Sequence, residues 1–180
     1  MKQAQRVIAT GGPGAGKTAV LNALKAHGFH VIEESARSII RERLGRGLPP
    51  RPVPREFALK VMQCDMANYR STESRSDWVF FDRGLLDGVC MLEQAAPFDP
   101  VKVAALNKRY IYNNKVFIFP PWAEIYQNDA ERDQSFFDAI HIFEMLSDYY
   151  RRYGYNLVEV PKASVGERCC FVLLSTATEI

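Results

Sequence analysis

The sequence predicts a single α/β domain built on a parallel sheet whose two faces are both covered by helices. Short apolar runs alternate along the chain with segments of helical periodicity. The runs are continuous rather than alternating, which is typical of strands buried on both faces. The 180 residues suffice for one hydrophobic core, and no repeat, low-complexity tract or linker divides the chain. We therefore expect one domain over residues 1–180.

The expected elements follow one another with short connections. Strands are predicted at 6–10, 29–32, 78–81, 116–119 and 157–160. Helices are predicted at 18–27, 34–46, 55–73, 85–95, 100–110, 134–153 and 165–174. Four prolines between 47 and 55 predict an extended loop there. The helix over 134–153 is strongly amphipathic. Its expected buried stripe consists of Phe136, Ile140, Phe143, Leu146 and Tyr150.

Composition and charge narrow the function classes. A net charge of +2 is too small to indicate nucleic acid or a membrane as the main partner. No apolar run approaches the roughly 18–20 residues of a membrane helix, and residues 1–10 are too short and polar for a secretory signal. We expect a cytoplasmic protein, either a monomer or a homodimer.

The cysteines do not predict a metal site. Cys64, Cys90, Cys169 and Cys170 form no CxxC pair, and the three histidines add no ligand spacing, which argues against zinc. The adjacent Cys169 and Cys170 are interpreted as thiols in the core.

A glycine-rich segment carries the strongest functional signal. Its residues fit the pattern GxxxxGK[ST] without a mismatch and are Gly11, Gly12, Pro13, Gly14, Ala15, Gly16, Lys17 and Thr18. It lies between a predicted strand and a predicted helix, where backbone N–H groups and the helix N-terminus attract phosphate. Lys17 is expected to reach the β- and γ-phosphates, and Thr18 to bind Mg²⁺. The predicted ligand is ATP, with GTP as the alternative.

Two charged residues follow the third predicted strand. The apolar run 78–81 ends at Asp82, and ligands of open α/β sheets lie at that edge of the sheet. Asp82 is therefore predicted to hold Mg²⁺, directly or through water. Arg83 is predicted to face the same cleft. The alternatives are a turn-forming aspartate and a surface arginine paired with a neighbour.

A further charged group follows the second predicted strand. Glu33, Glu34 and Arg37 lie there, and Glu34 and Arg37 share a face if a helix begins at this point. A carboxylate could take the proton of an attacking hydroxyl while an arginine holds the substrate. The alternative is that both glutamates only favour the helix N-terminus electrostatically. Local sequence does not decide which glutamate would be the base.

The segment 120–133 is a candidate lid. In this interpretation Arg132 would cover the transferring phosphate and neutralise its developing charge. The alternative is that Asn128 and Glu131 cap the following helix.

Four motifs together resemble a known family. GGPGAGKT (11–18), HVIEESAR (30–37), VFFDRG (79–84) and PPWAEIYQNDAER (120–132) are similar to small bacterial P-loop ATPases of the AAA-domain-like type. More distantly, the layout resembles nicotinamide riboside kinase and the deoxynucleoside kinases. That resemblance implies a three-layer, nucleoside- or nucleotide-kinase-like P-loop fold with a five-stranded parallel sheet and a lid. It also implies acceptor-side roles for Glu34, Arg37, Asp82 and Arg83. Gly84 departs from the serine of the deoxynucleoside kinase motif.

The function expected from these features is Mg²⁺-dependent transfer of the γ-phosphoryl group of ATP to a small nucleoside- or nucleotide-like acceptor. A hydrolase or switch that controls a partner protein is the alternative. Residues 107–110 begin like a guanine-binding NKxD motif but lack the aspartate, and Arg83 stands where mechanical AAA ATPases carry a second acid. A non-catalytic nucleotide-binding module is a third hypothesis.

Overall fold

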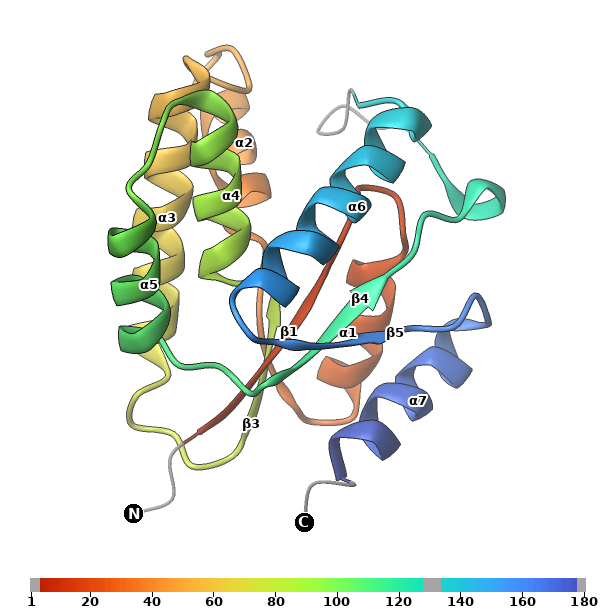
Figure 1. Ribbon diagram of the computed structural model, residues 1–180. Helices are drawn as coiled ribbons and strands as arrows, with labels where there is room; N and C mark the ends of the chain where they lie inside the picture. The colour runs from red at the N-terminus through yellow and green to blue at the C-terminus, as the bar shows by residue number, and fades with distance from the viewer. Residues whose placement is uncertain (1–3, 128–133, 178–180) are drawn as a thin grey trace.

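The computed structural model describes residues 4–127 and 134–177 and contains a five-stranded sheet in which every strand pair is parallel (Figure 1). The strand order is β2-β3-β1-β4-β5. The strands are β1 (Gln5–Gly11), β2 (His30–Ile32), β3 (Trp78–Asp82), β4 (Lys115–Phe119) and β5 (Asn156–Glu159). The helices are α1 (Lys17–Ala26), α2 (Ser35–Gly45), α3 (Pro54–Ser71), α4 (Leu85–Ala95), α5 (Pro100–Arg109), α6 (Phe136–Arg152) and α7 (Val165–Ala177), with a 3-10 turn η1 (Ala123–Ile125).

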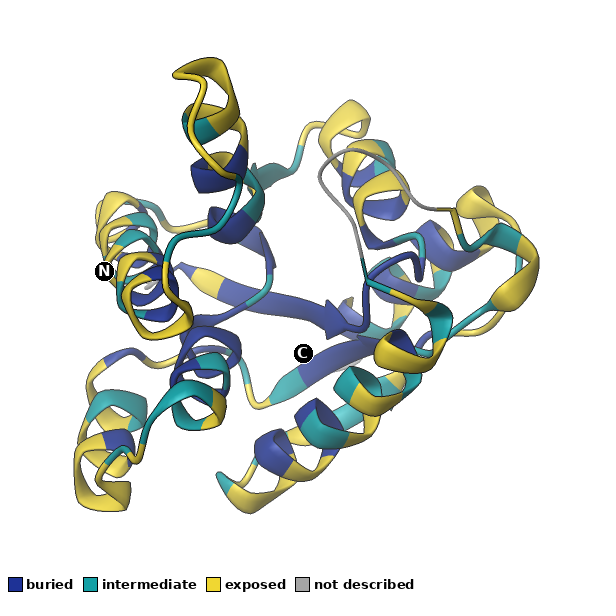
Figure 2. Cartoon of the chain, turned by 90° about the horizontal axis from the view of Figure 1, so that it is seen from above, coloured by how far each residue is buried: buried dark blue, intermediate teal, exposed yellow. Residues whose placement is uncertain are grey.

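Helices cover both faces of the sheet. Successive side chains of each strand point to opposite faces, so one apolar strand contributes to two cores. Val7 of β1 joins a core with α1 and α7, whereas its neighbour Ile8 joins a core with α3, α4, α5 and α6. The strands in the middle of the molecule are accordingly buried, and exposed residues gather on the outer faces of the helices (Figure 2). This arrangement confirms the predicted three-layer α/β fold with a five-stranded parallel sheet.

A third, smaller core lies between α2 and α3. It consists of Ala36, Ile39, Ile40, Phe57 and Val61. This core attaches α2 and the first turns of α3 to each other, next to the carboxyl ends of β2 and β3. It therefore holds one wall of the cleft described below.

Two sequence-based expectations about burial were wrong in part. On α6, Leu146 and Tyr150 are buried as expected, but Phe136, Ile140 and Phe143 are only half-buried. The other buried residues of this helix are Ala139, Ser147 and Tyr149. The helix is oriented so that the backbone of Ala139 lies against Gly12, which leaves no room for a side chain at position 12. On α7, Cys169 is buried as expected, but Cys170 is exposed, because it lies on the outer side of a helix with only one face on the core.

Among the described residues, none of the helices combines the length and apolar character that crossing a membrane requires.

Candidate functional site

The phosphate loop connects β1 to α1, as the motif predicts. Close contacts or positive φ angles favour glycine at several positions of this loop, and two of them show which helices surround it. A Cβ on Gly12 would overlap the backbone carbonyl of Ala139 on α6. Gly16 has a φ of +78°, and a Cβ there would lie 2.6 Å from the guanidinium of Arg168. The loop is therefore enclosed by α6 on one side and by α7 on the other.

Lys17 is buried beneath this loop. Its Nζ donates to the carbonyl oxygens of Gly11 at 3.1 Å and Gly12 at 2.8 Å. Burial, reinforced by the nearby positive charge of Arg83, lowers the pKa of Lys17 to about 8 despite the surrounding carboxylates. Two polyanionic phosphates beside Nζ would favour its charged form.

Thr18 and Asp82 lie together at the start of α1 and the end of β3. The Thr18 hydroxyl donates to Asp82 Oδ2 at 3.3 Å, while the buried Oδ1 has no hydrogen-bond partner among the described residues. Burial and the neighbouring Glu34 raise the pKa of Asp82 to about 6. An orphaned carboxylate oxygen beside a hydroxyl suits Mg²⁺, which prefers oxygen ligands and keeps several waters. No cluster of three or more His, Cys, Asp or Glu side chains in the described part of the chain could hold a metal by itself.

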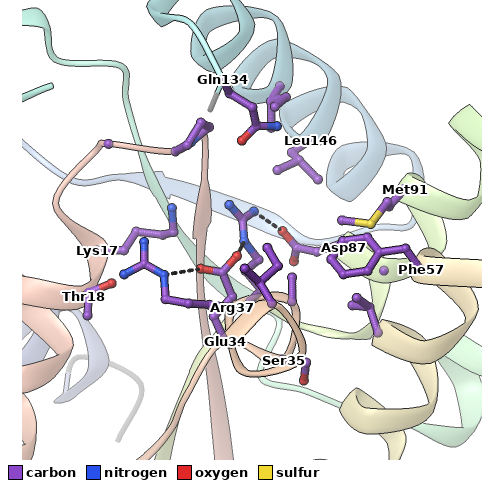
Figure 3. Close-up of a pocket in the computed structure, with 18 of the residues that line it drawn as sticks. Lys17, Thr18, Glu34, Ser35, Arg37, Phe57, Asp87, Met91, Gln134 and Leu146 are labelled. Atoms are coloured by element: carbon purple, nitrogen blue, oxygen red, sulfur yellow. Dashed lines mark hydrogen bonds and ion pairs between the residues drawn. The ribbon is translucent and has the colours of Figure 1, made fainter. Parts of the chain in front are cut away.

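A charged cluster lies next to these residues (Figure 3). Glu34, whose side chain is 18% exposed, accepts a hydrogen bond from Arg83 Nε at 2.9 Å and lies 4.0 Å from Arg37 Nε. The other end of the Arg83 guanidinium donates to Asp87 at 3.1 Å. Burial acts to raise the pKa of Glu34, but Arg83, Lys17 and Arg37 outweigh it and hold that pKa below its usual value. Glu34 is therefore an ionised carboxylate between two guanidinium groups.

The two neighbouring glutamates are clearly separated. Glu33 is 63% exposed and forms ion pairs with Lys25 at 3.9 Å and Arg41 at 3.3 Å, away from the cleft. The structure therefore places Glu34, but not Glu33, beside Arg37 and Arg83.

Arg83 has a strained backbone that aims its side chain. Its φ of +75° makes it the one positive-φ residue other than glycine in the described chain. This conformation costs roughly 1–2 kcal/mol for an L-residue. The Arg83 N–H donates to the carbonyl of Ala9 on β1 at 2.9 Å, so the sheet itself holds the turn. The alternative was a surface arginine paired with a neighbour. Arg83 is paired, with Glu34 and Asp87, but it is not on the surface, because its side chain is only 16% exposed.

The sequence reasoning missed Asp87, which holds this cluster together. Its carboxylate accepts hydrogen bonds from Thr10 Oγ1 at 2.5 Å, Tyr150 Oη at 2.6 Å and the Gly84 N–H at 2.9 Å, in addition to Arg83. The four donors come from β1, α6, the turn after β3 and the guanidinium. Its position four residues after Arg83 on a predicted helix was the available sequence signal.

Arg168 on α7 was also missed, since its partners are far away in sequence. Its Nη1 donates to the carbonyl of Ala15 in the phosphate loop at 3.1 Å. Its guanidinium carbon lies 5.4 Å from the centre of the Trp122 ring. Arg168 therefore joins α7 and the start of the segment 120–133 to the phosphate loop.

Only part of the candidate lid belongs to the described residues. Within it, Tyr126 lies against Gly14, where a Cβ would overlap the tyrosine ring, and its hydroxyl donates to the Gln134 carbonyl. Ile125 and Gln127 line the cleft. Arg132, predicted to act on the transferring phosphate, lies outside the described residues.

The phosphate loop and the charged cluster line one cavity of about 480 Å³, with Lys17, Thr18, Glu34, Arg37, Arg83 and Asp87 in its wall. In Figure 3, Lys17 and Thr18 lie on one side of Glu34, and Phe57 and Met91 lie on the other. The first side is lined by phosphate-loop residues, and the second by apolar residues of α2, α3, α4 and α6. The cavity thus combines a phosphate-binding end with an apolar end, with the charged cluster between them.

Known structures share this fold at low sequence identity. Deoxyadenosine kinase from M. mycoides, solved with dCMP and dCDP, has a TM-score of 0.66 and 10% identity, with 97% of this chain and 100% of that chain covered. Thymidylate kinase from Ehrlichia chaffeensis has a TM-score of 0.65 and 13% identity, covering 96% and 98%. Shikimate kinase from Acinetobacter baumannii, in complex with shikimate, has a TM-score of 0.58 and 16% identity, covering 97% and 94%. At these identities the likeness shows a kinase-like P-loop fold and no more.

No curated protein matches the sequence. A family model described as "AAA domain" matches residues 6–168, which includes the phosphate loop, the charged cluster and Arg168. The match confirms the resemblance to AAA-domain-like P-loop proteins, and the chain belongs to this AAA domain family.

Proposed function

We propose that this protein is a kinase that transfers the γ-phosphoryl group of ATP, bound with Mg²⁺, to a hydroxyl or phosphate of a small nucleoside- or nucleotide-like molecule. The observation that carries the proposal is the position of Glu34. It lies between Arg37 and Arg83 in a cavity that also contains Lys17 and Thr18. The kinase-like fold of the structural neighbours supports the same reaction class.

On the donor side, the phosphate loop would hold the triphosphate, and Lys17 would move from its carbonyl partners to the phosphates. Thr18 and Asp82 would hold Mg²⁺, whose chemistry is to neutralise charge on the phosphate oxygens. Arg132 remains a proposed contributor of further positive charge, in the candidate lid 120–133.

On the acceptor side, Glu34 would receive the hydrogen bond of the attacking hydroxyl. Its lowered pKa makes it a weak base, so it would chiefly orient the hydroxyl and take the proton late. That timing suits a loose phosphoryl-transfer transition state, in which little bond formation precedes departure of the leaving group. Arg37 and Arg83 would hold the acceptor and balance the charge of Glu34.

The test measures ADP release by the purified protein with ATP and Mg²⁺. Nucleosides, nucleoside monophosphates, nicotinamide riboside and shikimate are added one at a time, and GTP is tested in place of ATP. Turnover that depends on an acceptor supports the kinase. Turnover that is the same without any acceptor would favour a hydrolase or switch, and tight ATP binding without turnover would favour a binding module.

A further inference from the structure

The apolar end of the cavity contains a buried acid that the proposed phosphoryl transfer does not use. The apolar lining comes from Ile40, Phe57, Val61, Met91, Ile142 and Leu146. Asp65 of α3 lines the same cavity, although the residue is only 8% exposed. Lys, Glu, Arg and Asp are rarely buried this far unless they are paired.

Only one of the two carboxyl oxygens of Asp65 has a partner. Oδ1 accepts a hydrogen bond from Ser35 Oγ at 2.5 Å, and Ser35 Oγ in turn accepts one from Asn68 Nδ2 at 3.1 Å. Oδ2 is buried and makes no hydrogen bond to any described residue. A buried polar atom without a partner destabilises a fold, so a purely structural role for this oxygen is a poor explanation.

Gly88 of α4 lies directly beside this oxygen. A Cβ on Gly88 would lie 3.1 Å from Asp65 Oδ2 and 3.1 Å from Met62 Cγ. Gly88 also lines the cavity, and it is a helix-interior glycine, which is ordinarily unfavourable. A side chain at this position would press on the unpartnered oxygen, so glycine is the residue that fits beside it.

We propose that Asp65 determines the specificity of this cavity by hydrogen-bonding the polar edge of a flat heteroaromatic ring, of the size of a nucleobase, whose apolar faces contact Phe57, Val61 and Met91. The inference rests on the proposed function, since the ring would be the part of the phosphate acceptor that occupies the apolar end of the cavity.

The chemistry of the lining favours such a ring over a polyol. A cavity of about 480 Å³ is large enough for a small-molecule ligand. An aromatic ring presents apolar faces and concentrates its hydrogen-bonding atoms at the edge. An alicyclic polyol would bring several hydroxyls against apolar walls, where they would lose water without gaining partners.

The protonation state of Asp65 indicates which ring atom it would meet. Burial raises the pKa of Asp65 to about 8, against the Ser35 hydrogen bond, which lowers it. A neutral carboxyl that accepts from Ser35 at Oδ1 carries its proton on Oδ2. It would therefore donate to a ring nitrogen or carbonyl oxygen of the acceptor.

The test measures binding without ATP, by calorimetry, so that it does not depend on turnover. The ligands are adenosine, guanosine, cytidine, thymidine and nicotinamide riboside, with shikimate as the alicyclic comparison. We expect at least one ring compound to bind better than shikimate. Asp65→Leu should weaken that binding about tenfold or more, while the affinity for MgATP stays unchanged. Asp65→Asn should retain most of the binding, because its amide can still donate.

A second pair of variants keeps every hydrogen-bonding group. Gly88→Ala places a methyl group beside Asp65 Oδ2 and should weaken binding of the ring compound, again without affecting the affinity for MgATP. Gly166→Ala, a helical glycine of α7 with nothing within 4 Å of its Cβ position, should change neither affinity.

The outcomes separate this inference from the proposed reaction. Asp65-dependent binding of a ring compound without phosphoryl transfer would support the inference and contradict the kinase. Turnover of shikimate but of no ring compound would support a kinase reaction but overturn the inference, together with the nucleoside-like acceptor. Failure of every ring compound to bind, or equal ring affinity in Asp65→Leu and the unaltered protein, would overturn the inference.

Discussion

Glu33 and Glu34 are adjacent in the chain but lie in opposite electrostatic environments. Glu33 is in solvent with surface ion pairs, which contribute little to stability. Glu34 is fixed by two arginines within the cavity. The difference arises because β2 ends at Ile32 and α2 begins at Ser35, so consecutive side chains leave the connecting turn in different directions.

This pair offers a matched test at the level of single residues. Glu34→Gln should lower acceptor-dependent turnover on the order of 100-fold, because an amide cannot take the proton of the hydroxyl. Its effect on ATP affinity should be small. Glu33→Gln is the control and should keep near-normal turnover. The opposite ranking of the two variants in steady-state kinetics would assign the base to Glu33.

The buried carboxyl of Asp65 should make stability depend on pH. Because its pKa is raised to about 8, the folded protein holds a proton that the unfolded chain releases near pH 4. The free energy of unfolding should therefore fall as pH rises from about 4 to about 8, by a few kcal/mol at most.

Asp65→Asn removes this titration and should be more stable than the unaltered protein at pH 8. The advantage should shrink toward zero near pH 4, as measured by thermal unfolding at several pH values. A difference between the two proteins that does not vary with pH would contradict the assignment. Such a gain in stability would be typical of a residue retained for binding rather than for folding.

At the scale of elements, the phosphate loop depends on the helix that packs against it. Gly12 approaches the backbone of Ala139 on α6 so closely that no side chain fits between them. The same helix donates the Tyr150 hydroxyl to Asp87, which in turn holds Arg83. A shift of α6 would therefore change the position of both the phosphate loop and the acceptor-side residue Arg83.

Gly12→Ala should separate the loop from α6. The clash is with backbone rather than with a flexible side chain, so we expect a loss of about 1–3 kcal/mol in unfolding free energy and weaker ATP binding. Gly45→Ala, at the end of α2, has open space around the added methyl group and is the control. Denaturant unfolding and ATP titration of the two variants would check this. Equal behaviour would show that α6 can move without cost.

Some residues of this site could be predicted from local sequence patterns, and others could not. The phosphate loop, Asp82 and the Glu34–Arg37 spacing are local patterns, in which residue type and sequence distance already imply the geometry. Asp65, Asp87 and Arg168 could not be assigned in the same way. Their contacts join residues 30, 77 and 153 positions apart, so they depend on how α3, α4 and α7 pack rather than on local pattern.

The fold as a whole was predictable because continuous apolar strands alternating with helices leave few alternatives to a covered parallel sheet. Which side of each helix is buried was less predictable. On α6, several apolar stripes are possible, and the contact of Ala139 with Gly12 selects one of them.

At the scale of the whole molecule, nucleotide binding should stabilise the folded state. With ligand at 100 times its Kd, the gain is about 2.7 kcal/mol, or a rise in Tm on the order of 5–10 °C for a chain of this length. Lys17→Ala removes the phosphate-binding ammonium and should abolish the rise produced by MgATP. The comparison of Tm with and without MgATP is made within each protein, since the variant also loses the two carbonyl contacts of Lys17. A normal rise in the variant would refute the assignment of the loop.

The central place of β1 has a consequence for the order in which the molecule is assembled. β1 ends at Gly11, yet both of its neighbours in the sheet come much later in the sequence, β3 ending at Asp82 and β4 at Phe119. While the chain emerges from the ribosome, the apolar side chains on both faces of β1 have no neighbouring strands until β3 and β4 have been synthesised. Nascent chains that end before Phe119 should therefore expose an apolar strand and depend on chaperones to avoid aggregation.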